Sequence, residues 1–231
     1  MKKFLLSALI SIIFSFTATA VERNNRIAAF AFQTPDKVAG SRRSLALYLT
    51  KPYRSDYDKL QAIAYWISSH IAYDGYKYNN GKVSAKELQY EYDVLQYRTG
   101  ICTDFAELFT EIANEAGIPG VETVRGYVLE KQNKIKRFYN QRDVSKEAGH
   151  AWNRVKIGKR AFFVDTTFMA RGSIGENGIR PASSFKHKHD VKDRKRMNYV
   201  NTQVNDFFFD FTPKQELYEF RTIHLMEKYI K

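Results

Sequence analysis

Residues 100–117 read GICTDFAELFTEIANEAG and predict an amphipathic helix with Cys102 in its first turn. Gly100 precedes the helix, and Gly117 with Pro119 ends it. At 100° per residue, Cys102 lies within about 20° of Phe109 around the axis, so its sulfur faces the inner side. The apolar residues at helical spacing are Ile101, Phe105, Leu108, Phe109, Ile112, Ala113 and Ala116.

Cys102 is the single cysteine of the 231 residues, so the chain cannot form an internal disulfide. The thiol is therefore free, paired with another chain, or used in chemistry; a small buried apolar residue is the alternative. The amides and the positive dipole end of a first helical turn stabilise a thiolate, the nucleophilic form of cysteine. Asp104 and Glu107 partly oppose this effect, so strong activation requires a neighbouring imidazolium.

Two later strands supply a histidine and an aspartate. Residues 123–129 and 150–157 read as strands, and Gly158-Lys159 predicts a type II′ hairpin turn into a further strand that extends through Thr167. With that turn Ile157 faces Arg160, and His150 becomes a diagonal neighbour of Asp165 on one face of the sheet, about 7 to 8 Å away at the backbone.

These residues predict a thiol enzyme. Cys102 is the expected nucleophile, His150 exchanges the proton, and Asp165 orients the histidine and stabilises its charged form. The backbone N–H of Cys102 is one expected oxyanion donor, and Gln96 is the candidate for a second, although a polar helix residue is its simpler interpretation. Trp152 is expected to pack over the histidine or cover the hairpin, and Asn153 to be a polar residue at a strand edge.

Two further helices are expected before the cysteine. Ser55 and Asp58 resemble a capping box that opens a helix over about residues 56–72. Ser84 and Glu87 repeat the pattern and predict a second helix that ends near Arg98.

The N-terminus has the form of a secretory signal. Two lysines precede an apolar stretch over residues 4–16, and small residues follow at 18–20. We therefore expect residues 1–20 to be a signal peptide, residues 21–231 to form a single domain, and the protein to be periplasmic or secreted. The core of that domain is expected over about residues 55–170, with a C-terminal extension over residues 171–231.

The chain is strongly basic, with 37 Lys and Arg against 25 Asp and Glu and a net charge of +12. Such a charge favours anionic partners, for example an anionic envelope surface. The densest basic run, residues 186–196, has no interleaved aromatic residues, which argues against a dedicated nucleic-acid site. His187 and His189 lie in that run without a further histidine or cysteine at ligand spacing, so no metal or other cofactor is predicted. The oligomeric state stays open.

Three blocks of the chain resemble the transglutaminase-like superfamily of papain-type thiol enzymes. They are residues 97–109, residues 116–119 with 126–127, and residues 150–153 with 164–168. Residues 206–213 are similar, more loosely, to the terminal segment of the kyphoscoliosis-peptidase-like branch. The resemblance implies an α+β fold in which a cysteine helix packs on an antiparallel sheet that carries the histidine and the aspartate. Position by position it assigns the catalytic roles to Cys102, His150 and Asp165.

The resemblance leaves the reaction open. The first expectation is hydrolysis of a peptide or amide bond in a peptide or protein substrate. The second is transamidation, in which an amine resolves the same thioester and the protein is a glutamine acyltransferase. The third is a non-catalytic module in which the fold is a scaffold for a basic binding surface.

Overall fold

The computed structural model describes residues 22–73, 94–129, 148–170, 174–175, 178–179, 200–211 and 224–227. The predicted signal peptide and the run with His187 and His189 lie outside these residues. Residues 22–32 form a helix. In the N-terminal half the other elements are η1 (Asp36–Gly40), α2 (Arg42–Thr50), α3 (Asp56–His70), β1 (Ala72–Tyr73), α6 (Val94–Tyr97), β2 (Thr99–Gly100) and α7 (Cys102–Glu115). The C-terminal half contributes β3 (Val121–Leu129), β4 (Ala148–Ile157), β5 (Arg160–Val164), α9 (Thr166–Ala170), β6 (Ile174–Gly175), β7 (Gly178–Ile179), η2 (Asp206–Phe208), β8 (Phe209–Phe211) and β9 (His224–Glu227).

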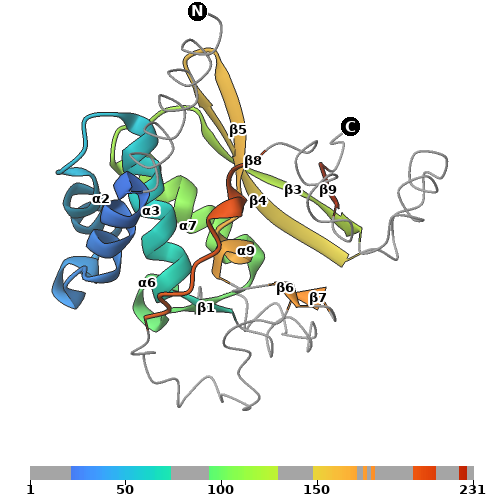
Figure 1. The fold of residues 1–231 in the computed structure, drawn as a ribbon, viewed down its shortest axis with the longest axis horizontal. Helices are drawn as coiled ribbons and strands as arrows, with labels where there is room; N and C mark the ends of the chain where they lie inside the picture. The colour runs from blue at the N-terminus through green and yellow to red at the C-terminus, as the bar shows by residue number, and fades with distance from the viewer. Residues whose placement is uncertain are drawn as a thin grey trace, which may run out of the picture.

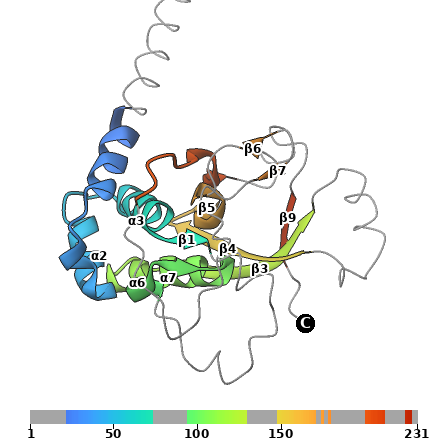
Figure 2. The same cartoon turned by 90° about the horizontal axis from the view of Figure 1, so that it is seen from below.

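The main sheet is antiparallel, with strand order β8-β5-β4-β3-β9. Helix α7 packs against β3 and β4, while α3 packs against α2, α7 and α9. In Figure 1 the helices α2 and α3 lie to one side of the long strands β4 and β5, and Figure 2 shows the same arrangement from below. The chain therefore has the predicted α+β fold, with the cysteine helix against an antiparallel sheet. None of the described helices is long and apolar enough to cross a membrane.

The predicted helix after Ser55 is confirmed as α3. The Ser55 hydroxyl accepts a hydrogen bond from the Asp58 amide at 3.1 Å, as an N-cap serine should. The helix ends at His70 rather than Ala72, because Ile71 is already extended. Strand β1 follows directly after Ile71 and pairs in parallel with β2, the strand that lies immediately before α7. Of the second predicted helix only α6 falls within the described residues.

The hairpin register is confirmed, since Ile157 pairs with Arg160 and Asn153 with Val164. Gly158 has a φ of 59°, which the first central residue of the predicted turn requires. The prediction that the second strand continues through Thr167 is wrong. β5 ends at Val164, and Thr166 begins the short helix α9.

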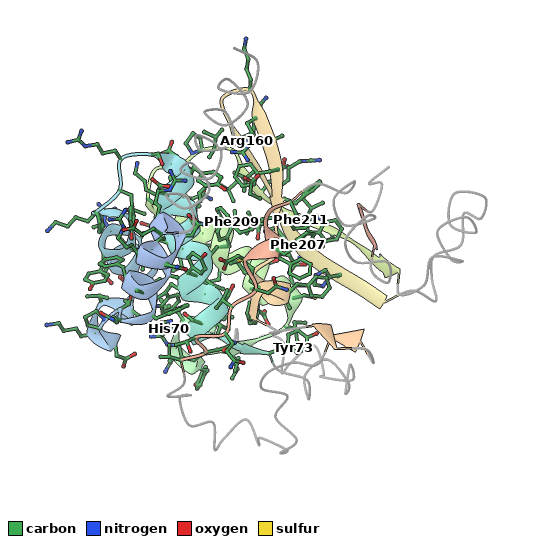
Figure 3. The ribbon with its side chains drawn as sticks, in the orientation of Figure 1. His70, Tyr73, Arg160, Phe207, Phe209 and Phe211 are labelled. Carbon is green, nitrogen blue, oxygen red and sulfur yellow. The ribbon has the colours of Figure 1, made fainter. Side chains whose placement is uncertain are left out.

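The segment over residues 200–211 returns to the sheet and covers α9. The Asn201 amide donates to the Ser69 carbonyl at 2.7 Å, and the Asn205 amide donates to the Met169 carbonyl at 3.0 Å. Phe207, Phe209 and Phe211 gather where this segment meets β5 (Figure 3). Phe208 and Phe211 are almost completely buried, so the segment is part of the core that supports α9.

Candidate active site

Cys102 is the first residue of α7, and 6% of its surface is exposed. Ile101 precedes it and has no polar side chain to cap the helix; instead the Asp104 carboxylate accepts a hydrogen bond from the Ile101 amide at 2.8 Å. A Cβ atom on Gly100 would lie 2.7 Å from the Cβ of Asp104, so only glycine fits beside this turn. These contacts fix the start of α7, and they hold the Cys102 sulfur at the N-terminal end of that helix.

The His150 side chain comes from β4 and joins Cys102 to Asp165. Its Nε2 lies 2.6 Å from Asp165 Oδ2, and both side chains are buried. The imidazole also interacts with the Cys102 side chain, because each group shifts the pKa of the other toward its charged form. Because Nε2 is engaged by Asp165, Nδ1 is the nitrogen left for the sulfur. The structure thus brings together the three side chains on which the sequence prediction rests.

Asp165 reaches the histidine by a different route from the predicted one. We expected Asp165 to lie within a strand, as a diagonal neighbour across the hairpin. It is instead the residue that caps α9: its Oδ1 accepts a hydrogen bond from the Phe168 amide at 2.9 Å, and its carbonyl accepts one from the Met169 amide. Its own amide donates to the Phe208 carbonyl at 2.9 Å. The carboxylate is therefore held by a helix start on one oxygen and by His150 on the other.

The electrostatics of the site favour a thiolate–imidazolium pair. Burial raises the pKa of Cys102, but the hydrogen bond and the positive charge of His150, with a hydrogen bond from the Ala151 amide, outweigh it and lower the pKa from its ordinary value. Burial also lowers the pKa of His150, yet the Asp165 carboxylate and Cys102 raise it to about 9. The two shifts have opposite directions, and each favours the charged form of its group, so together they favour the thiolate–imidazolium pair over the neutral thiol and imidazole.

Strand β5 ends before it reaches the part of β4 that carries the Ala151 amide. Ladder pairing between β4 and β5 stops at Asn153 and Val164, so the part of β4 that carries Ala151 has no β5 partner. The Ala151 amide lowers the pKa of Cys102 by hydrogen bonding to its sulfur. Cys102, Ala106 and Ala151 form a small buried cluster at this point. Small side chains on α7 and β4 thus let the helix approach the strand closely.

Two aromatic rings lie parallel to the His150 imidazole. The Phe168 ring centroid is 4.5 Å away with an interplanar angle of 17°, and that of Trp152 is 6.0 Å away at 21°. The expected packing of Trp152 near the histidine is therefore present. The sequence prediction gives Phe168 no separate role, because it expects a strand through Thr167 instead of the helix α9 that carries this ring.

Asn153 is a buried link between β4 and α7, and the expectation that it lies at a strand edge is wrong. β4 is an interior strand, and Asn153 is 0% exposed. Its Nδ2 donates to the Ala106 carbonyl at 2.9 Å and to Thr110 Oγ1 at 3.0 Å. Ala106 lies one helical turn after Cys102, so the amide fixes the cysteine helix on the histidine strand.

Replacing Asn153 by Ala should lower the free energy of unfolding by about 2 kcal/mol, because two buried hydrogen bonds are lost. Urea denaturation measures the change. The control is Arg154→Ala, which removes an exposed pair with Glu122 and should cost less than about 1 kcal/mol. Equal losses in the two variants would contradict the assigned role of Asn153.

Gln96 lies on α6 with its side chain exposed. Its proposed part as a second oxyanion donor stays a prediction. Among the described residues, no group of three or more histidine, cysteine or acidic side chains has the arrangement of a metal site.

A family model and a curated relative match this chain. The model of the transglutaminase-like superfamily matches residues 43–166. Kyphoscoliosis peptidase from Mus musculus is 30% identical over 120 residues, which are 52% of this chain and 17% of that protein. The chain thus spans less than a fifth of the length of this relative.

Two solved structures are also similar. A putative cysteine protease from Cytophaga hutchinsonii is 19% identical with a TM-score of 0.41, over 88% of this chain and 63% of the other. A structure described as a TGase is 16% identical with a TM-score of 0.36, over 68% of this chain and 35% of the other.

Proposed function

Because the chain belongs to the transglutaminase-like superfamily, we propose that it is a cysteine hydrolase that cleaves a peptide or amide bond with Cys102, His150 and Asp165. One observation carries the proposal: His150 Nε2 lies 2.6 Å from Asp165 Oδ2, and the same imidazole lowers the pKa of the buried Cys102 thiol. A nucleophile, a base and a group that orients the base are the parts that acyl transfer by a thiol requires.

The first half-reaction forms a thioester. The Cys102 thiolate attacks the substrate carbonyl carbon, and the oxyanion that develops lies near the Cys102 amide at the start of α7. As the carbon–nitrogen bond breaks, the His150 imidazolium gives its proton to the leaving nitrogen, which departs as an amine or as ammonia. The imidazole is already charged before the substrate binds, so this step needs no prior proton transfer from the thiol.

The second half-reaction releases the acid. His150, now neutral, takes a proton from water, and the resulting hydroxide attacks the thioester carbon. The carbon–sulfur bond breaks, the carboxylic acid leaves, and the thiolate–imidazolium pair is restored. Asp165 keeps Nε2 protonated throughout, so Nδ1 is the nitrogen that exchanges the proton.

We also propose that the protein acts outside the cytoplasm on a peptide or protein. The charged, apolar and small-residue parts of residues 1–20 support export. The net charge of +12 supports contact with an anionic envelope surface.

A product assay tests the proposed reaction. The wild-type chain and Cys102→Ala are incubated with glutamine-containing peptides, with and without a primary amine. Hydrolysis predicts new amino termini or released ammonia from the wild type alone, with little amine incorporated. Abundant amine incorporation would replace hydrolysis with transamidation, and products that Cys102→Ala forms equally well would contradict both.

A further inference from the structure

We propose that Phe168 is a positioning residue of the triad, whose ring lies against the face of the His150 imidazole and favours its charged form. The inference rests on the proposed function, since it assigns to Phe168 a part in maintaining the thiolate–imidazolium pair.

The geometry is that of a cation on an aromatic face. The two ring centroids are 4.5 Å apart and the planes differ by 17°, so the imidazole lies over the ring rather than at its edge. The face of a phenyl ring is negative and attracts a cation within about 6 Å of its centroid. Phe168 is 3% exposed and His150 is 8% exposed, and exclusion of water strengthens this attraction.

The same residue also holds the third member of the triad. The Phe168 amide donates to Asp165 Oδ1 at 2.9 Å, while Asp165 Oδ2 faces His150. Phe168 thus contacts Asp165 through its amide and His150 through its ring. A change confined to the ring leaves the amide contact available.

The C-terminal segment fixes this ring in place. The ring centroids of Phe208 and Phe168 are 5.2 Å apart, and the Phe208 carbonyl accepts a hydrogen bond from the Asp165 amide. Phe208 packs against Phe168 and makes a matched control, because the same substitution there removes a ring from the core but leaves the Phe168 ring against the histidine.

Among the described residues, the charged groups that act on His150 are Asp165, at the junction of β5 and α9, and Cys102 on α7. Both favour the imidazolium, while burial opposes it. The direction of a shift therefore separates two effects of a mutation. Loss of the aromatic face lowers the midpoint of His150, whereas mere entry of water raises it.

The experiment is an NMR titration of the full chain with labelled histidine. The His150 signal is identified by its absence in His150→Gln, and its midpoint is followed in the wild type, Phe168→Leu and Phe208→Leu. We expect a wild-type midpoint near 9 and a decrease of about one pH unit in Phe168→Leu. In Phe208→Leu the midpoint should stay at the wild-type value, although both variants lose thermal stability.

An unchanged or raised midpoint in Phe168→Leu would overturn the proposal, and so would an equal decrease in Phe208→Leu. The readout does not need turnover. If the midpoint falls in Phe168→Leu alone and the wild type cleaves no peptide or amide, the role of Phe168 stands while the proposed reaction fails.

Discussion

Replacing Cys102 by Ala should lower kcat/KM by about 10⁵-fold or more, because the nucleophile is removed and no thioester can form. The free energy of unfolding should change by less than about 1 kcal/mol, since the site already consists of small side chains, Ala106 and Ala151. The measurement is the rate of peptide or amide cleavage, followed alongside urea denaturation.

Cys102→Ser is the matched control for shape. The hydroxyl occupies nearly the same volume but does not ionise beside the imidazole, so activity should be lost almost as completely as in the alanine variant. Residual activity above one hundredth of the wild type in either variant would mean that another group attacks the substrate.

Replacing Asp165 by Asn should lower kcat by about 10⁴-fold. The neutral side-chain amide of Asn neither stabilises the imidazolium nor selects the tautomer in which Nδ1 faces the sulfur. The side-chain oxygen of the new Asn can still accept a hydrogen bond from the Phe168 backbone amide, so the start of α9 should be retained. Steady-state kinetics and circular dichroism of the variant measure these two effects separately.

Asp165→Ala separates the two functions of the carboxylate further. It removes the contact with His150 and the cap of α9 together, so we expect the same loss of activity with about 1 kcal/mol of additional destabilisation. If Asp165→Asn keeps most of the wild-type rate, the orienting role of Asp165 is contradicted whatever the stability of the alanine variant.

The parts of the fold that follow from the sequence are those with strong local signals. Ser55 marks the start of α3 through its own hydroxyl, and the apolar stripe of α7 has a clear helical period. Gly158 sets the hairpin turn and with it the register of β4 on β5. In each case residues adjacent in sequence determine the structure.

The parts that could not be predicted depend on contacts between distant residues. Residues 166–170 read Thr-Thr-Phe-Met-Ala, and their β-branched and aromatic residues favour a strand. They form a helix because the Asp165 side chain accepts a hydrogen bond from the Phe168 amide as a cap, and because two distant contacts support it. The Phe208 carbonyl accepts a hydrogen bond from the Asp165 amide, and the Ser68 hydroxyl donates one to the Thr166 carbonyl. Asn153 is polar, so the sequence alone predicts that it is exposed. It is buried because α7 packs over this part of β4. A buried asparagine on an inner strand is visible only once the layers are known.

The pH dependence of Cys102 alkylation by iodoacetamide tests the thiolate–imidazolium pair most directly. Only the thiolate reacts, and its fraction in an ordinary thiol falls about tenfold for each pH unit below its pKa. Because His150 lowers the pKa of Cys102 in the folded chain, the logarithm of the native rate should fall with a clearly smaller slope between pH 8 and about pH 6 than that of an ordinary thiol. In the chain denatured in urea, and in the folded His150→Gln variant, the logarithm of the alkylation rate should fall by nearly one for each pH unit over the same range. The slope is independent of how easily the reagent reaches the sulfur. A native chain whose rate falls in parallel with the denatured chain would contradict the ion pair on which the account depends.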